Sequence, residues 1–206
     1  TYDEMMELAS LGAGVLHNRS VELAKKYGVH LSVRSSLNKE EGSLIKEGVS
    51  VEKTLISGVA VDKDTARVAV IELEDQPGVA FKLFHHLARH DINVDMILQS
   101  VGRNGTKDIS FTVNEDDLEE TVATLERHRH SSLKWKKVDV EKNVAKLSIV
   151  GAGIKSHAGV AAAMFEALYN VGVNIKMIST SEIRITVLID EKYLDKAMNA
   201  VHDKFF

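Results

Sequence analysis

The stretch "GVAAAMFEALYNVGVNIKMI", residues 159–178, closely repeats the stretch "GVAFKLFHHLARHDINVDMI" at residues 78–97. The two stretches lie 81 positions apart, and eight of their twenty aligned pairs are identical. Two unrelated stretches of this length would share about one or two identities by chance. The chain therefore carries a duplicated unit, and we expect both copies to adopt one fold.

The first copy has the order of elements βαββαβ. Apolar, β-branched runs predict strands, and apolar positions at helical spacing predict two helices. The expected strands are residues 68–73, 93–98, 108–113 and 133–138, and the expected helices are residues 79–89 and 116–127. This order is typical of a ferredoxin-like unit, with helices on one face of an antiparallel sheet. The predicted fold class is α+β.

The second copy shows the same order but stops one strand short. Its expected strands are 145–150, 173–179 and 183–189, and its expected helices are 159–170 and 192–204. The best spare strand, "LISGVAV" at 55–61, lies just before the first copy. We therefore predict that the first copy (65–138) is inserted in the second (55–64 plus 139–206), after a linker at 47–54.

The turn Gly151-Ala152-Gly153 follows a strand and precedes a helix, as a dinucleotide-binding turn does. However, the third glycine of that fingerprint is replaced by Ser156, and no acidic residue closes the next strand. The first copy has "DQPG" (75–78) at the same point, without Gly-x-Gly. We therefore disfavour an NAD(P)-binding oxidoreductase, an alternative that titration with NAD(P)H would test.

Composition excludes several other classes of function. The formal net charge of −4 argues against a nucleic-acid-binding surface. No run approaches the ~20 apolar residues of a membrane span. The chain has no cysteine, which excludes disulfides and thiolate metal sites and suits the cytoplasm. We expect a cytoplasmic protein without nucleic-acid or membrane partners.

The nine histidines raise the possibility of a metal site. Only His86 and His90 have the i, i+4 spacing that places two ligands on one helix face, and no carboxylate is spaced to complete a triad. We expect these histidines to lie on a solvated helix face and predict no metal site.

Two longer stretches carry a resemblance to a known family. "DQPGVAFKLFHHLARHDINVDMI" (75–97) and "GIKSHAGVAAAMFEALYNVGVNIKMISTSEIRITVLI" (153–189) resemble ACT domains, the amino-acid sensors of biosynthetic enzymes. With "TYDEMMELASLGAGVLHNRSVELAKKYGVHLSVRSS" (1–36) and "DMILQS" (95–100), the whole chain resembles the C-terminal regulatory half of the aspartokinase family. That family nests one ACT unit inside the other, which agrees with the strand count.

The resemblance also implies what the chain lacks. Enzymes of this family transfer the γ-phosphoryl group of ATP to L-aspartate, giving 4-phospho-L-aspartate for lysine, threonine and methionine synthesis. Their kinase domain, where ATP and Mg²⁺ are expected, opens with a Lys-Phe-Gly-Gly-Thr motif that does not occur here. Residues 1–46 resemble only the end of that domain. We expect a regulatory fragment with no catalytic residue and no cofactor of its own.

The turn before each first helix is the candidate effector site. Gly78 begins a helix whose free N–H groups suit an α-carboxylate, and Asp75 could hold an α-ammonium. The plainer interpretation is that Asp75 caps the helix and Gly78 only turns the chain. The resemblance implies effector contacts at Asp75, Gly78, Ala80, Asn93, Gln99 and Ser110 in the first copy. It implies contacts at Ser156, Gly159, Asn174, Thr180, Ser181 and Glu182 in the second.

The expected effectors are lysine, threonine or both, with their assignment to the two copies left open. Free sheet edges predict a homodimer through the ACT units. Two alternatives remain: a freestanding sensing subunit that docks on a separate catalytic chain, and a purely structural dimerisation module.

Overall fold

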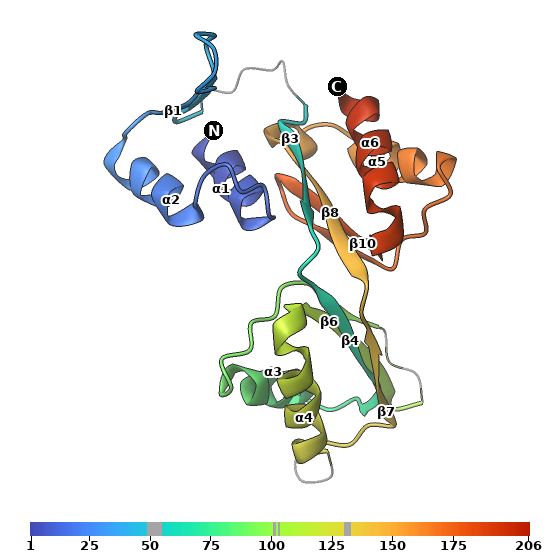
Figure 1. Ribbon diagram of the computed structural model, residues 1–206. Helices are drawn as coiled ribbons and strands as arrows, with labels where there is room; N and C mark the ends of the chain where they lie inside the picture. Colours follow the sequence, from blue (N-terminus) through green and yellow to red (C-terminus); the bar gives the residue numbers. More distant parts are fainter. Residues whose placement is uncertain (49–54, 101, 103, 130–132) are drawn as a thin grey trace. The chain divides into compact units, whose positions relative to one another are not determined.

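A computed structural model describes residues 1–48, 55–100, 102, 104–129 and 133–206 of the chain. The chain divides into two compact units, which we call the inserted unit and the outer unit (Figure 1). The inserted unit comprises Lys63–Ala145 and Asp190–Lys192, and the outer unit comprises Thr1–Asp62, Lys146–Ile189 and Tyr193–Phe206. Most of the predicted linker, residues 49–54, lies outside the described residues.

The inserted unit contains the first copy. Its sheet has the order β5-β6-β4-β7 with every pair antiparallel. These strands are β4 (Ala66–Glu74), β5 (Ile97–Gln99), β6 (Thr106–Val113) and β7 (Lys137–Glu141). Two helices, α3 (Val79–Ala88) and α4 (Leu118–His128), cover one face of the sheet, and the 3₁₀ turn η1 (Glu115–Asp117) leads into α4 (Figure 1).

Apolar side chains on these helices explain why they pack on the sheet. Leu83 and Leu87 of α3 lie one turn apart and are fully buried. Leu125 of α4 is only 2% exposed. Phe111 of β6 packs in the same cluster and meets Phe84 edge to face at 5.6 Å. The inserted unit therefore has a hydrophobic core of its own.

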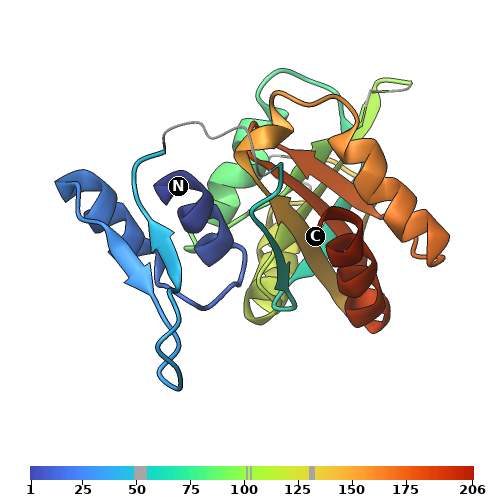
Figure 2. The same cartoon turned by 90° about the horizontal axis from the view of Figure 1, so that it is seen from above.

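The outer unit contains the second copy. Its sheet has the order β3-β8-β10-β9, and its described pairs are antiparallel. The strands are β3 (Gly58–Asp62), β8 (Val144–Val150), β9 (Met177–Thr180) and β10 (Arg184–Asp190). Helices α5 (Val160–Asn170) and α6 (Leu194–Phe205) lie side by side against it (Figure 2). The short 3₁₀ turn η2 (Ala152–Ile154) precedes α5, and η3 (Glu191–Tyr193), most of which is counted with the inserted unit, leads into α6.

The pairing of β3 with β8 decides the topology. Val59 opposes Ile149 and Val61 opposes Leu147, so a strand that precedes the first copy completes the sheet of the second. This pairing confirms the predicted nested arrangement and the α+β fold class. The antiparallel strands also differ from the parallel sheet that a dinucleotide-binding fold requires.

The N-terminal segment belongs to the outer unit. It consists of α1 (Tyr2–Ser10), α2 (Asn18–Tyr27) and a two-stranded sheet of β1 (Leu31–Val33) and β2 (Ser43–Ile45). Tyr2, Val21 and Ile45 form a small core for this segment. Leu11, after α1, packs with Ala60 of β3 and Val150 of β8, which joins the segment to the sheet.

Three predicted strands were placed wrongly. The strand expected at 173–179 begins only at Met177, as β9. The strand expected at 93–98 is limited to β5, although Asp95 and Met96 still bond to Thr112 through their N–H groups. The strand expected at 133–138 begins only at Lys137, because Leu133 and Trp135 fill the core from a non-strand segment. Burial without strand pairing produced the apolar pattern that favoured a strand.

Candidate functional site

A hollow of about 520 Å³ opens where β4 meets α3 in the inserted unit. Gly78 is the N-cap of α3 and has φ of 86°, in the left-handed region that favours glycine. Residues 75–81 and Lys107 line this hollow, which we call the first hollow. The hollow therefore gathers Asp75, Gly78 and Ala80 from the predicted effector site at the N-terminus of a helix.

Asp75 is not an open carboxylate in this hollow. Its Oδ1 lies 2.9 Å from the Nζ of Lys107, whose side chain is 11% exposed. The Asp75 N–H donates to the carbonyl of Gly105 at 2.9 Å. The plainer interpretation, in which Asp75 caps α3, does not describe this structure, since α3 has no side-chain cap.

The other three residues predicted for the first copy do not line the first hollow. Asn93 is exposed in the segment between α3 and β5. Gln99 opposes Ile109, which points into the core, whereas Ser110 opposes Leu98. Because opposing residues share a face and neighbours alternate, Gln99 and Ser110 lie on opposite faces of the sheet.

The second turn, residues 151–159, also ends in a left-handed glycine, but it is longer, contains η2 and has different chemistry. Gly159 begins α5 with φ of 97° and no side-chain cap. The hydroxyl of Ser156 donates to the carbonyl of Gly153 at 3.3 Å and lies 3.0 Å from Nδ1 of His157. Ser156 and His157 therefore bond within this turn.

The β9–β10 hairpin lies against this second turn. The N–H of Gly151 donates to the carbonyl of Ile183 at 3.0 Å, and Lys155 pairs with Glu182 at 2.7 Å. The second turn supplies two of the predicted residues, and the end of β9 with the loop after it supplies three. All five are exposed: Ser156, Gly159, Thr180, Ser181 and Glu182. Asn174 is exposed between α5 and β9.

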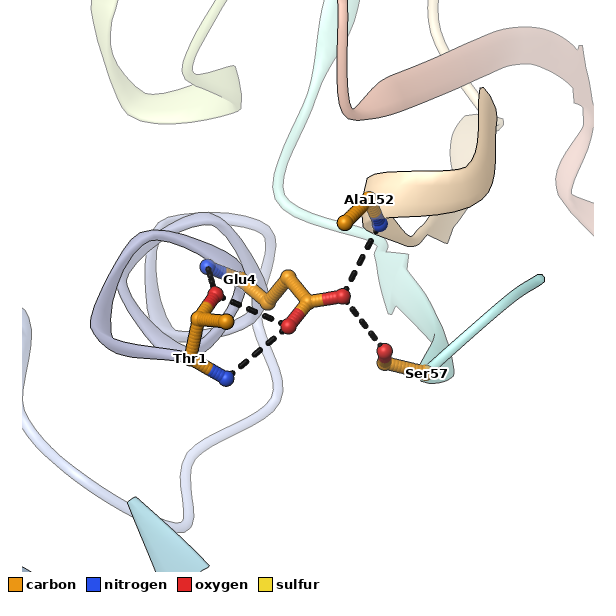
Figure 3. Close-up of polar contacts among 4 residues, drawn as sticks. All are labelled: Thr1, Glu4, Ser57 and Ala152. Atoms are coloured by element: carbon orange, nitrogen blue, oxygen red, sulfur yellow. Dashed lines mark hydrogen bonds and ion pairs between the residues drawn. The ribbon is translucent and has the colours of Figure 1, made fainter. Parts of the chain in front are cut away.

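A buried acid that sequence reasoning missed supports this second turn. Glu4 of α1 is 7% exposed, and its Oε1 accepts from the Ser57 hydroxyl at 2.6 Å and the Ala152 N–H at 2.9 Å (Figure 3). Its Oε2 accepts from the amino and hydroxyl groups of Thr1. One turn later Glu7 pairs with Arg184, the first residue of β10, at 3.3 Å. Helix α1 thus contacts both the second turn, through Ala152, and the start of β10, through Arg184.

These contacts keep Glu4 charged. Burial alone would raise the pKa of its carboxyl, but hydrogen bonds from Ser57, the Thr1 amino group, Ala152 and the Thr1 hydroxyl lower the pKa to about 2. The spacing Thr1-x-x-Glu4 is a capping-box signal, and the capping box is present. That signal marks the start of a helix, but it contains no information about Ser57 or Ala152.

The glycines of the Gly151-Ala152-Gly153 turn have a packing role. A Cβ on Gly151 would lie 2.4 Å from the carbonyl oxygen of Leu55, and one on Gly153 would lie 2.7 Å from the same oxygen. The chain entering β3 therefore approaches the turn too closely for any side chain. This approach explains the Gly-x-Gly pattern without a nucleotide.

Two histidines of the inserted unit stack on each other. The rings of His86 in α3 and His128 in α4 are 3.6 Å apart and nearly parallel. Burial and the nearby His128 lower the pKa of His86. His90 lies 3.1 Å from Glu120. Within the part of the chain that the structure describes, no group of three or more His, Asp or Glu could hold a metal ion.

A family model for the ACT domain matches residues 68–128 and 147–205. The regulatory subunit of aspartate kinase from Thermus thermophilus is 40% identical, with a TM-score of 0.70 over 74% of this chain and 100% of that one. A structure of aspartokinase alpha and beta subunits is 44% identical, with a TM-score of 0.68 over 73% and 98% of the two chains. This chain belongs to the aspartokinase family.

Curated aspartokinases match nearly the whole chain. The protein from Helicobacter pylori (strain ATCC 700392 / 26695) is 49% identical over 98% of this chain, and that from Bacillus sp. (strain MGA3) is 46% identical over 100%. The chain spans about half the length of these relatives. It is an aspartokinase regulatory region with tandem ACT domains. Among its described residues, no helix is long and apolar enough to cross a membrane.

Proposed function

We propose that this chain binds amino-acid effectors and thereby regulates an aspartate kinase that phosphorylates L-aspartate with ATP. The main support is the first hollow, where a carboxylate, a lysine and the N-terminus of α3 converge. These groups complement the carboxylate and ammonium of a free amino acid. Threonine and lysine are the proposed effectors.

Thermal unfolding tests effector binding directly. A ligand that binds the folded chain alone stabilises it by about 2.7 kcal/mol at a hundredfold excess over its dissociation constant. L-threonine or L-lysine should therefore raise the melting temperature, whereas D-threonine serves as the matched control. No shift with either L-amino acid would contradict the proposal.

The chain alone is proposed to be inactive as a kinase. We infer that residues 1–46 are the end of a kinase domain whose remaining part would hold ATP and Mg²⁺, and that the regulatory region is cytoplasmic. A coupled assay with aspartate and ATP should show no turnover. Effector-independent turnover by the chain, after removal of contaminating kinase, would contradict this inference.

A separate regulatory subunit is the second candidate. The relative from Thermus thermophilus is a regulatory subunit, and this chain covers all of it. Mixing the chain with a catalytic aspartokinase chain should then give a stable complex by size-exclusion chromatography. The absence of a complex at micromolar concentrations would favour a regulatory region within one polypeptide.

The edge strands support assembly into a homodimer. β5 and β9 lie at the edges of their sheets, and Ile97, Leu98 and Ile178 on them are 54%, 47% and 43% exposed. Exposed apolar side chains on unpaired edges favour pairing with a second chain. Light scattering should give twice the monomer mass of 22.7 kDa, and a monomer in the presence of effector would contradict the pairing.

A further inference from the structure

The first hollow contains two opposite charges that face each other. Among the described residues that line it, Asp75 and Lys107 are the charged ones, and they pair at 2.9 Å. The Lys107 side chain is 11% exposed, compared with 44% for Asp75. Lys107 is therefore a largely enclosed part of the hollow.

The backbone of β4 positions this pair. The β4–β6 register shifts between Val70 and Leu73, and Glu72 within the shift has φ of 52°. Such an irregularity re-aims the side chains beside it, and Lys107 is the residue that opposes Leu73. Gly102 lies close to the carboxylate of Asp75. A Cβ at position 102 would be only 2.5 Å from Oδ2 of Asp75. A glycine at position 102 thus leaves room for the Asp75 carboxylate, and Lys107 lies beside the register shift.

The pair determines which ligand charges find a partner. A ligand α-carboxylate gains Lys107 and the first-turn N–H groups of α3, whereas a ligand α-ammonium shares Asp75 with Lys107. A second ammonium on the ligand, as in lysine, finds no further acid in the lining and is repelled by Lys107.

We propose that Lys107 is a specificity-determining residue, which makes the first hollow select amino acids with uncharged side chains over lysine. This inference rests on the proposed function, since it assumes that the hollow takes a free amino acid. To the proposed function it adds the class of effector, amino acids with uncharged side chains, and the residue that disfavours lysine.

Titration followed by backbone amide resonances tests the proposal on the full chain. The amides of Gly78 and Val79 report the first hollow, and those of Gly159 and Val160 report the second turn. L-threonine and L-lysine are the two probes. Lys107→Gln removes the charge and Lys107→Arg retains it. Lys82→Gln, an exposed site on α3, is the control for loss of one positive charge.

In the unmodified chain, Gly78 and Val79 should respond to threonine at lower concentration than to lysine. Lys107→Gln should shift the ratio of the two dissociation constants at least tenfold toward lysine, while Lys107→Arg and Lys82→Gln leave the ratio within about twofold. An unchanged ratio in Lys107→Gln, an equal shift in Lys107→Arg, or a preference for lysine in the unmodified chain would overturn the role of Lys107. No response to any amino acid at Gly78 and Val79 would instead overturn the proposed function, and this role with it.

Discussion

The two turns of this duplicated chain share a left-handed glycine before the helix but differ in length and in chemistry. Gly78 and Gly159 both begin a helix in the left-handed region, with φ of 86° and 97°. The inserted unit places an ion pair, Asp75 with Lys107, beside its helix, whereas Ser156 of the outer unit bonds within its own loop. Duplication has preserved the presentation of helix N–H groups and changed the charges around them.

The turns also differ in what supports them. The outer turn is held by Glu4 from α1 and by the approach of Leu55 to Gly151. The inserted turn borders an open hollow, and a Cβ on Gly78 would meet nothing within 4 Å. Substitutions should therefore damage the stability of the outer turn more than that of the inserted turn.

The largest effect is expected at Glu4. Glu4→Gln removes the charge that accepts four hydrogen bonds, and should lower the free energy of unfolding of the outer unit by about 2 to 3 kcal/mol. Asp3→Asn, at an exposed position on the same helix, is the matched control and should change it by about 0.5 kcal/mol or less. Urea unfolding measures both, and equal losses would contradict the contrast.

The same carboxylate predicts a pH dependence. The folded pKa of about 2 lies below the ordinary value of 4.5, so the unfolded state binds the proton more tightly. The stabilisation is complete above pH 4.5 and is lost as the pH falls toward 2. The difference between the unmodified chain and Glu4→Gln should shrink over that interval, and a difference independent of pH would exclude a role for the Glu4 charge.

A smaller difference should separate the two turn glycines. Gly151→Ala places a Cβ 2.4 Å from the Leu55 carbonyl oxygen and should destabilise the chain by about 1 to 3 kcal/mol. Gly78→Ala meets no atom, so its cost is the left-handed backbone alone, about 1 kcal/mol. Thermal unfolding of the two variants without ligand compares them, and a larger loss in Gly78→Ala would reverse the comparison.

The smallest effect on stability is expected at Gln99. This exposed residue ends an edge strand, so Gln99→Ala should change the free energy of unfolding by less than about 0.5 kcal/mol. If Gln99 contacts the effector side chain in the assembled protein, the variant should lose part of the effector-induced melting shift. An effector response identical to that of the unmodified chain would remove Gln99 from the site.

The sequence predicted the nested fold because its repeat and its missing strand are both properties of residue order. The candidate site was harder to predict from the sequence. Gly78 and Asp75 were found from turn chemistry, but Lys107 pairs with Asp75 from β6, beside a register shift that no local pattern records. Glu4 was missed for a similar reason, since Ser57 and Ala152 lie 53 and 148 positions away. Side chains that meet across such separations become visible only when the strands are paired.

The closure of the outer sheet by β3 has a consequence for the order of folding. Pairing β3 with β8 brings Asp62 opposite Lys146, which lies 84 positions later in the chain. Within the inserted unit, Arg67 of β4 already opposes Glu141 of β7, five positions from each of these two residues. If the inserted unit folds first, the loop that remains to be closed between β3 and β8 is shortened to about ten residues. The entropic contribution to the free-energy cost of closing it then falls by about 2 kcal/mol. Pulsed hydrogen exchange during refolding should therefore protect β4 and β7 before β3 and β8. Simultaneous protection of the four strands would show that the outer sheet forms without the inserted unit folding first.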